Sequence, residues 1–438
     1  MKRTKMLSAF IATLAIITIS SILTTGAAAA GKEKVLFKFN GKDGEWGTGR
    51  LTFDANGNIY GATANGGNDS SGCYDYGCGT AFMMTPGKNG KWSEKRLHSF
   101  GVNDGSPTGG LVMDAAGNLY GMTCPLTTGG SGTVYELSPQ ADGKWTETVV
   151  HTFNGNDGAC PSEDLISDAA GNLYGTTEYG GAVKCVDGSG NAIGCGVVFE
   201  LSPGTNGKWT EKVLHFFDGT DGFNSRAGLT FDGAGNLYGT TLSGGTGKCT
   251  NGNGNVVGCG TVFRLTPDGK GSWKETVLYS FQYNGTDGLD PTGRVALDTS
   301  GNLYGTTYLG GPYIYGTVFK LAPGRSGKWS MTVLQSFDGG DDGAQPWYGP
   351  LVGATGEIYG STCYGGGWDM GTIFELTAGK NGKWTEDVLF SFSGQDGRIP
   401  AELISDQAGN LYGTTMVGGN PNDCLNDGGC GVVFEFTP

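Results

Sequence analysis

Short stretches of alternating hydrophobic and polar residues recur along the whole chain after residue 30. The stretch Gly196–Pro203 (Gly-Val-Val-Phe-Glu-Leu-Ser-Pro) alternates with a period of two and ends on a proline, as many β-strands do. A glycine-rich turn leads from it to residues 208–217, a second strand-like stretch that contains a tryptophan and ends in phenylalanine. Because no stretch after residue 30 keeps a helical period, the pattern predicts an all-β protein.

A ten-residue pattern, Asp-x-x-Gly-Asn-Leu-Tyr-Gly-Thr-Thr, sets the period of the chain. Its tyrosine recurs seven times, at Tyr60, Tyr120, Tyr174, Tyr238, Tyr304, Tyr359 and Tyr412. The copy at Gly353–Thr362 is degenerate. The Asp-x-x-Gly segment predicts a tight turn between a first and a second strand, and two further strands follow in each unit. A fixed core with variable spacers is typical of stacked supersecondary units.

The two ends of the chain predict how these units are arranged. Residues 33–39 resemble a fourth strand with no partners before it, and the chain ends directly after a third strand. Pairing Val35–Phe39 with residues 431–438 completes a seventh sheet and leaves no open edge. We therefore predict a seven-bladed β-propeller of four-stranded antiparallel blades, with an open β-solenoid as the alternative. The predicted blades are residues 48–101, 107–153, 161–217, 225–281, 291–337, 347–392, and 398–438 together with 33–40.

The first 30 residues have the pattern of a secretory signal peptide. Three basic residues precede an apolar stretch at 6–23, and Ala28–Ala30 fits a small-residue cleavage site before Gly31. A membrane anchor is the alternative, but the apolar stretch is short and contains Thr and Ser. We expect the remaining chain, 31–438, to be secreted, either extracellular or periplasmic, with no further membrane span.

Eleven cysteines in an exported chain predict disulfides. Four local pairs precede third strands, and a fifth pair joins neighbouring repeats; the expected pairs are Cys73/Cys78, Cys185/Cys195, Cys249/Cys259, Cys424/Cys430 and Cys124/Cys160. This pairing leaves Cys363 free. Zinc is the competing interpretation, but no histidine lies near any pair in the sequence.

The formal net charge is −14, and removal of the three basic residues of the leader takes the mature chain to −17. This charge argues against nucleic acid or an anionic membrane as a partner and favours a self-repelling monomer.

Three signatures recur in register: Gly-Asn-Leu-Tyr-Gly-Thr-Thr, Gly-(Thr/Val)-Val-Phe-Glu-Leu-(Ser/Thr)-Pro and Gly-Lys-Trp-Thr-Glu-x-Val-Leu. Together they resemble the GloVer-type tandem repeat of secreted bacterial proteins, over nearly all of residues 33–438. The resemblance implies the repeat architecture and no established chemistry. Members often end in a surface anchor, whereas this chain ends on a blade strand.

The loops that vary between repeats are expected to share one face of the ring, and function on a propeller usually resides in such loops. We call this the variable face: the second-to-third loops and the blade-to-blade loops. Six of nine tryptophans belong to the repeated fourth strand and are expected to pack. The aromatic residues outside the repeat pattern are the candidate ligand-binding residues: Trp46, Tyr313, Tyr315, Trp347, Tyr348, Tyr364 and Trp368. Flat aromatic faces suit sugar rings, although such residues can also fill gaps between glycine-rich loops.

Catalysis has less support in the sequence. The three histidines, His98, His151 and His215, share one slot of the fourth strand that other blades fill with Phe, Tyr or Gln, so we predict no histidine triad and no metal site. Carboxylates outside the repeat pattern, which we expect mainly to solvate the surface, are Glu163, Asp164, Asp290 and Asp369. The aspartates of the Gly-x-Asp-Gly loops could hold calcium, but one carboxylate per loop is few and Asp-Gly is an ordinary turn.

These observations predict a non-catalytic recognition protein that needs no cofactor and binds an extracellular glycan or a surface protein. A polysaccharide-cleaving enzyme that uses loop carboxylates is one alternative. A structural component of the cell envelope is the other.

Overall fold

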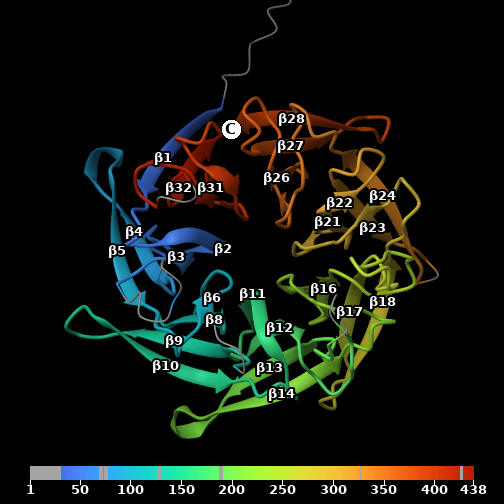
Figure 1. Ribbon diagram of the computed structural model, residues 1–438, viewed down its shortest axis with the longest axis horizontal. Coiled ribbons are helices and arrows are strands. Elements are labelled where there is room, and N and C mark those ends of the chain that lie inside the picture. Colours follow the sequence, from blue (N-terminus) through green and yellow to red (C-terminus); the bar gives the residue numbers. More distant parts are fainter. Residues whose placement is uncertain are drawn as a thin grey trace, which may run out of the picture. The chain divides into compact units, whose positions relative to one another are not determined.

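Seven antiparallel sheets stand around one axis in the computed structural model (Figure 1). It describes residues 31–68, 73, 77–125, 130–186, 191–325, 327–424 and 428–438, and the predicted signal peptide lies outside them. Within Gly31–Pro438, a single compact unit, each sheet runs from a first strand at the axis to a fourth strand at the rim. The all-β prediction and the number of blades are therefore confirmed.

Blade one contains β2 (Glu45–Phe53), β3 (Ile59–Asn65), β4 (Thr80–Pro86) and β5 (Trp92–Ser99). Blade two contains β6 (Ser106–Pro107), β7 (Val112–Met113), β8 (Leu119–Cys124), β9 (Thr133–Pro139) and β10 (Trp145–Thr152). Blade three contains β11 (Ala159–Ser167), β12 (Leu173–Tyr179), β13 (Val197–Pro203) and β14 (Trp209–Phe216). Blades four and five contain β15 (Thr230–Phe231), β16 (Leu237–Thr241), β17 (Thr261–Pro267) and β18 (Trp273–Ser280); then β20 (Ala296–Leu297), β21 (Leu303–Thr307), β23 (Thr317–Pro323) and β24 (Trp329–Ser336), with the small extra pair β19 (Gly288–Leu289) and β22 (Leu309–Gly310).

Blade six contains β25 (Leu351–Val352), β26 (Ile358–Thr362), β27 (Thr372–Ala378) and β28 (Trp384–Ser391). Blade seven contains β29 (Arg398–Pro400), β30 (Ile404–Ser405), β31 (Leu411–Val417), β32 (Val432–Thr437) and β1 (Lys32–Lys38). Two short 3-10 turns, Lys88–Gly90 and Thr205–Gly207, lie between third and fourth strands. Among the described residues, no helix has the length and hydropathy needed to cross a membrane.

The ring closes through the N-terminal strand, as predicted. β1 pairs antiparallel with β32, with Lys32 opposite Thr437 and Lys38 opposite Val432. Phe39, which follows β1, then packs edge-on against Phe82 of blade one at a ring-centroid distance of 5.2 Å. The first and last strands of the described chain thus share one sheet, which leaves no open edge at this position.

Adjacent blades are joined by a repeated pair of aromatic contacts. The buried phenylalanine that ends each fourth strand packs against the aromatic ring in the third strand of the next blade, as in Phe217 with Phe263 at 5.2 Å. Six of the seven repeat tyrosines contact the fourth-strand tryptophan of the next blade, as in Tyr174 with Trp273 at 6.3 Å. Burial of these large rings between sheets supplies much of the hydrophobic stabilisation, together with edge-to-face geometry.

The constant spacing of the Asp-x-x-Gly-Asn-Leu-Tyr pattern along the chain is explained by one aspartate. In blade four, Asp232 Oδ1 accepts hydrogen bonds from the backbone N–H groups of Ala234 (2.8 Å) and Asn236 (2.9 Å). Its Oδ2 accepts from Asn236 Nδ2 (2.7 Å) and from the Tyr238 hydroxyl (3.0 Å). Burial alone would raise the pKa of Asp232, but these hydrogen bonds hold it below its usual value. The turn therefore depends on an ionised carboxylate.

We expect Asp232→Ala to lower the free energy of unfolding by about 2–3 kcal/mol, because the substitution removes all four hydrogen bonds to the carboxylate. Urea denaturation would measure this loss. The matched control is Asp268→Ala, since Asp268 caps an exposed turn of the same blade with two backbone hydrogen bonds and no side-chain donor. Equal losses in the two variants would contradict a special role for the repeat aspartate.

Candidate functional site

Charged side chains meet at the axis of the ring, at one slot of the first strands. This slot lies four residues before the first position of the Asp-x-x-Gly turn, directly ahead of a hydrophobic residue such as Leu51 or Leu165. Blades one, three, five and seven place a charged residue there, and blades two, four and six place glycine. In order around the ring the seven residues are Arg50, Gly110, Asp164, Gly228, Arg294, Gly349 and Glu402.

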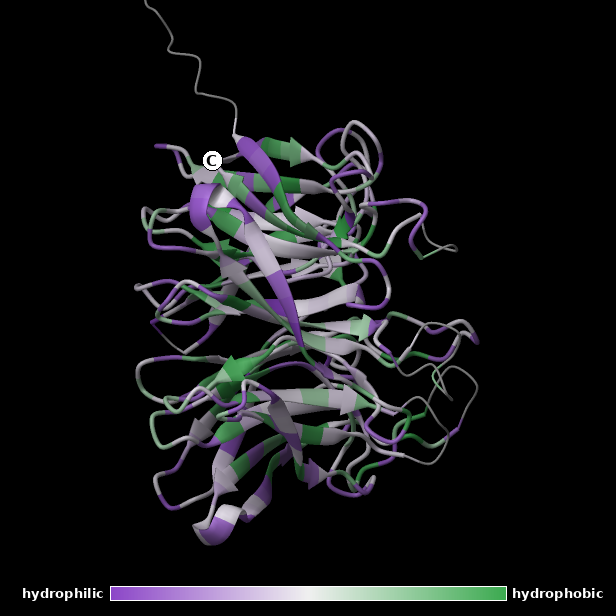
Figure 2. Cartoon of the chain, turned by 90° about the vertical axis from the view of Figure 1, so that its left-hand side faces the viewer, coloured by the Kyte–Doolittle hydropathy of each residue, from purple (hydrophilic) through white to green (hydrophobic). Residues whose placement is uncertain are grey.

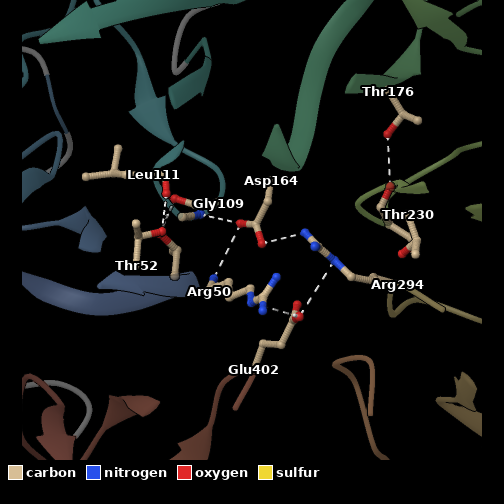
Figure 3. A network of polar contacts seen from close by, with 12 residues as sticks. Arg50, Thr52, Gly109, Leu111, Asp164, Thr176, Thr230, Arg294 and Glu402 are labelled. Atoms are coloured by element: carbon tan, nitrogen blue, oxygen red, sulfur yellow. Dashed lines mark hydrogen bonds and ion pairs between the residues drawn. The ribbon is translucent and has the colours of Figure 1, made fainter. Parts of the chain in front are cut away.

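The four charged residues form one connected network (Figure 3). Asp164 Oδ2 accepts a hydrogen bond from Arg294 Nη2 at 2.9 Å. Asp164 Oδ1 accepts from the Gly110 backbone N–H at 2.5 Å and from the Arg50 backbone N–H at 3.4 Å. Glu402 Oε1 lies 3.7 Å from Arg294 Nε and 4.0 Å from Arg50 Nε. The network thus joins charged residues from four blades across the axis.

Glycine is required at the alternate slots because the innermost strands approach one another closely. A Cβ atom on Gly110 would lie 1.9 Å from the Arg50 carbonyl oxygen, and one on Gly349 would lie 2.2 Å from the Arg294 carbonyl oxygen. Both distances are far below van der Waals contact. The glycines therefore let the charged residues of the odd-numbered blades reach the axis.

Two carboxylates expected to solvate the surface are buried instead, Asp164 in this network and Glu163 next to it, so that prediction was wrong for them. Asp164 is 4% exposed and Glu163 is 8% exposed. Glu163 has a φ of 59°, in the left-handed region that is costly for a residue with a side chain. Burial, followed by the charges of Asp164 and Glu402, raises the pKa of Glu163 well above its usual value. These surroundings favour the neutral acid form of Glu163.

Glu163, Asp164 and Glu402 place carboxylate oxygens within 4.8 Å of one another, a spacing that a metal ion could bridge. The same oxygens face Arg294, which is paired with Asp164 and lies against Glu402. Burial raises the pKa of Glu402, and the charge of Arg294 opposes that shift. The positive charges of Arg294 and Arg50 already compensate the two carboxylates, so this cluster is better suited to ion pairing than to holding a cation.

A cavity of about 270 Å³ opens beside this network. Its polar lining comes from Arg50, Arg294 and Asp164, and its apolar lining includes Leu111 and Ile404. Thr52, Phe53, Val112 and Ser405 also line it, and they lie at the ends of first strands that lead into the Asp-x-x-Gly turns. The cavity, called the axial cavity below, is therefore on the side of the ring opposite the variable face.

Half-buried glutamates lie between adjacent blades, near the rim. They occupy the second position after the fourth-strand tryptophan, or the equivalent place in β1, and Met331 takes this place in blade five. Burial is the main cause that raises the pKa of each, with the aspartate of a Gly-x-Asp-Gly loop or another acid nearby adding to it. The pKa values are about 7 for Glu33, Glu94, Glu147, Glu211 and Glu275, and about 8 for Glu386. Each of these six side chains has one buried oxygen without a hydrogen-bond partner.

The three histidines lie in the same interfaces, next to these acids. His215 Nε2 lies 2.8 Å from Asp221 Oδ2, and His98 Nε2 lies 3.4 Å from Glu147 Oε2. His98, Asp104 and Glu147 also place their ligand atoms within 4.8 Å of one another. The aspartates of the Gly-x-Asp-Gly loops, the calcium candidates of the sequence, mainly cap their own loops; Asp157, for example, accepts from the backbone and side chain of Asn154.

Long loops gather on one face of the ring and short turns on the other, as Figure 2 shows edge-on. The candidate aromatic residues of the variable face divide into two groups. Tyr313, Tyr315 and Trp368 are 56%, 44% and 67% exposed, and Trp46 of β2 is 38% exposed. These four rings present faces to solvent.

The other three candidates pack within blades five and six. Tyr348 is buried, and its carbonyl oxygen accepts a hydrogen bond from Thr306. Trp347 is half-buried and contacts the Tyr308 ring edge-on at 5.0 Å. Tyr364 is half-buried, and its backbone pairs with Ala344. The burial of Tyr348 and the ring contact of Trp347 fit the packing role that was the alternative to ligand binding.

A pocket of about 510 Å³ lies between blades four and five on the variable face. Tyr283, which is 70% exposed, stands at this pocket together with Leu289, Leu309 and the Cys249 loop. Asp290 also lines it, and burial raises the pKa of Asp290 to about 6. We call it the blade 4–5 pocket.

Two polar groups of the blade 4–5 pocket have no partner among the described residues. Asn251 Nδ2 is buried and donates no hydrogen bond, although its Oδ1 accepts from Asn253 and Asn255. None of the described residues donates a hydrogen bond to the Asp290 carboxyl group. A buried amide donor without a partner is unusual in proteins, and a ligand in the pocket could accept from it, while the half-buried Asp290 carboxyl stays open to solvent beside it.

Sequence reasoning identified Asp290 as an exception to the repeat but did not connect it with Tyr283. The signal was present in the blade-to-blade loop. Phe281 is followed by Gln-Tyr-Asn-Gly-Thr-Asp-Gly, whereas Phe217 is followed by Asp-Gly-Thr-Asp-Gly, so this loop carries two extra residues that include Tyr283. An insertion in an otherwise uniform loop is a place to expect a site.

Five disulfides hold the loops of the variable face: Cys73–Cys78, Cys124–Cys160, Cys185–Cys195, Cys249–Cys259 and Cys424–Cys430. These are the predicted pairs, four of them from local spacing and Cys124–Cys160 as the pair that remains across neighbouring repeats, and Cys363 is free and buried. Burial raises the pKa of Cys363 to about 12, so its thiol is unreactive at neutral pH. Five disulfides are typical of proteins that fold in an oxidising compartment.

The fold and its repeated blade core define this chain as a β-propeller of the tandem-repeat class. Two segments, 73–256 and 248–438, match the model of the Gloeobacter/Verrucomicrobia repeat. Because these matches cover residues 73–438, which is 366 of 438 residues, the chain belongs to the Gloeobacter/Verrucomicrobia repeat family. No curated protein matches the sequence.

Solved structures share the fold at low sequence identity. PorZ of Porphyromonas gingivalis, a bacterial surface component of the type-IX secretion system, aligns with 92% of this chain and 48% of its own, with a TM-score of 0.50 and 15% identity. A puromycin-hydrolysing peptidase of Mycobacterium tuberculosis aligns with 87% of this chain and 50% of its own, with a TM-score of 0.51 and 10% identity. This chain spans about half the length of each. The PQQ-bound aldose sugar dehydrogenase of Streptomyces coelicolor aligns with 93% of this chain and 98% of its own, with a TM-score of 0.42 and 14% identity. At these identities the likeness concerns the fold alone.

Proposed function

We propose that this protein is a secreted, non-catalytic recognition protein that binds extracellular glycans through the blade 4–5 pocket. The observation that carries the proposal is the combination, in one pocket, of the exposed Tyr283 ring with two unpartnered polar groups, Asn251 Nδ2 and the Asp290 carboxyl. An aromatic platform beside an amide donor and a carboxyl acceptor is the set of groups that a sugar ring and its hydroxyls require.

The volume of the pocket supports a small carbohydrate unit as the ligand. At about 510 Å³ it falls within the range of ~300–1,000 Å³ that is common for small-molecule sites. The exposed rings of Tyr313, Tyr315 and Trp368 follow in the loops of blades five and six, the next positions around the ring. These rings would add contacts for neighbouring units of a longer chain.

Secretion is supported by the five disulfides together with the signal pattern of residues 1–30. The negative charge of the mature chain favours neutral or basic glycans over polyanions as partners.

The proposal is tested with the purified mature chain, residues 31–438, on insoluble cellulose, chitin and xylan and on a glycan array. We expect retention on at least one polysaccharide. Tyr283→Ala is expected to weaken that retention about five- to thirtyfold, because stacking on the ring supplies about 1–2 kcal/mol of the binding free energy. Asp290→Asn tests the hydrogen-bonding role without a change of shape.

Phe216→Ala is the matched control, since Phe216 is an aromatic residue that is 38% exposed on the outer strand of blade three. It should bind as the unaltered chain does. Absence of binding to every glycan, or equal weakening by the control, would contradict the proposal. Release of reducing ends from a bound polysaccharide would contradict the non-catalytic part of it and favour a polysaccharide-cleaving enzyme.

A further inference from the structure

The axial cavity is separate from the blade 4–5 pocket and contains a guanidinium group whose hydrogen bonds are unmade. No described residue accepts a hydrogen bond from the Arg50 guanidinium, and its nearest carboxylate oxygen, Glu402 Oε1, is 4.0 Å from Nε. The Arg50 side chain is 42% exposed and lines the cavity. Arginine carries five N–H donors in a fixed planar fork, which suits a carboxylate or another planar anion.

A second arginine faces the same cavity. Arg294 lines it, its side chain is 11% exposed, and its Nε is buried without a hydrogen-bond partner. The Asp164 carboxylate occupies only Nη2 of Arg294. Burial and the nearby Arg294 charge both lower the pKa of Arg50. The Asp164 and Glu402 charges act in the opposite direction on Arg50, so what the cavity offers an added carboxylate is the set of Arg50 N–H donors that these two acids leave without hydrogen bonds.

The remaining walls of the axial cavity indicate the rest of the ligand. Buried leucines and an isoleucine, among them Leu51, Leu165 and Ile404, form its apolar part. The volume of about 270 Å³ is at the small end of the range for small-molecule sites. An inorganic anion would leave these apolar walls without contacts.

We propose that the axial cavity binds a small organic acid, with the carboxylate of the acid on Arg50 and Arg294 and its apolar body against the leucines. The carboxylate of the acid would join the ion pairs of Arg50, Arg294, Asp164 and Glu402. The cavity that holds the acid lies on the side of the ring opposite the variable face. This site is independent of the glycan site, because the two share no residue.

The test uses the mature chain and phenylacetate as the probe, with phenylacetamide as its neutral isostere and with phosphate and sulfate as inorganic anions. Isothermal titration calorimetry and the melting temperature measure binding. We expect phenylacetate to bind and to raise the melting temperature, with phenylacetamide, phosphate and sulfate binding at least tenfold more weakly. Arg50→Met should raise the Kd for phenylacetate at least tenfold.

A second variant separates loss of ligand binding from loss of folding in Arg50→Met. Val112→Phe places a larger side chain in the cavity and leaves every charged residue in place, so it should block phenylacetate while the ion pairs persist. Failure of phenylacetate to bind the unaltered chain, or equal binding to either variant, would overturn the site. Phosphate or sulfate binding as tightly as phenylacetate would overturn its assignment to an organic acid. Glycan retention is measured in the same variants and should be unchanged, which separates this site from the proposed function.

Discussion

Arg294→Met is expected to lower the free energy of unfolding by about 3–5 kcal/mol, the loss typical of removing one partner from a buried ion pair. The substitution leaves Asp164, which is 4% exposed, and Glu402, which is 5% exposed, without their compensating charge at the axis. Urea denaturation at pH 7 measures the change. Arg325→Met, an exposed arginine of a rim turn, is the control and should change stability by less than about 0.5 kcal/mol.

Much of the free energy of unfolding lost in Arg294→Met should return when the carboxylates left without a partner are also replaced by neutral side chains. Asp164→Asn and Glu402→Gln, combined with Arg294→Met, leave no buried charge unpaired, and the amide carbonyl introduced at position 164 can still accept from the Gly110 N–H. We therefore expect the triple variant to be more stable than Arg294→Met alone, since replacing a whole buried ion network is often nearly neutral. A triple variant as unstable as the sum of its parts would show that the network is not coupled.

The second large effect concerns pH. Six interface glutamates have folded pKa values of about 7 or 8, whereas an unfolded glutamate has about 4.5. A raised folded pKa means that the folded state holds protons that the unfolded state has released. The stability that these glutamates supply is complete below about pH 4.5 and is lost as pH rises through 7. We expect the melting temperature to fall from about pH 5 to about pH 8 and to level off above that, with a loss of about 1 kcal/mol of stability per glutamate after solvent screening.

Two histidines and the repeat aspartates have the opposite effect, because they lower the stability of the folded protein as pH falls. Burial lowers the pKa of His98 and His151, so their protonation opposes folding as pH falls below about 6.5. The repeat aspartates, of which Asp232 is an example, have lowered pKa values and lose their contribution below about pH 4. Maximum stability should therefore lie on the mildly acidic side of neutrality.

Blade five suggests the matched variant for this test, because Met331 already occupies the glutamate position there without a charge. Glu94→Gln, Glu211→Gln and Glu275→Gln together should flatten the fall of melting temperature above pH 6. A melting temperature that is constant or rises from pH 6 to pH 9, or a pH profile that the triple Gln variant leaves unchanged, would contradict the assignment.

The ring and its closure could be predicted because both depend on residues that recur at regular positions of the repeat. The seven tyrosines mark the second strands, and the orphan strand at 33–39 leaves only one partner that completes a sheet. The disulfide pairs followed from spacing for the same reason, since each local pair lies in an equivalent loop.

The axial network was missed because it depends on contacts between residues more than a hundred positions apart. Asp164 and Arg294 are separated by 130 residues, and neither lies in a motif with known chemistry. Considered alone in the sequence, Asp164 and Arg294 each resemble an ordinary surface charge. Only a comparison of the first strands with one another, slot by slot, reveals that charge and glycine alternate there. The blade 4–5 pocket was missed for a related reason, since its walls come from loops of two blades.

The alternation at the axis has a consequence for how many repeats this chain can hold. Seven is odd, so two slots of the same kind must stand beside each other somewhere, and here they are the charged slots Glu402 of the last blade and Arg50 of the first. Their opposite signs make that neighbourhood favourable. A relative that gained or lost a single repeat would have an even number of slots, so charge and glycine could alternate around its whole ring and different residues would meet at the centre. Repeat number and the chemistry of the central slot should therefore evolve together in this family.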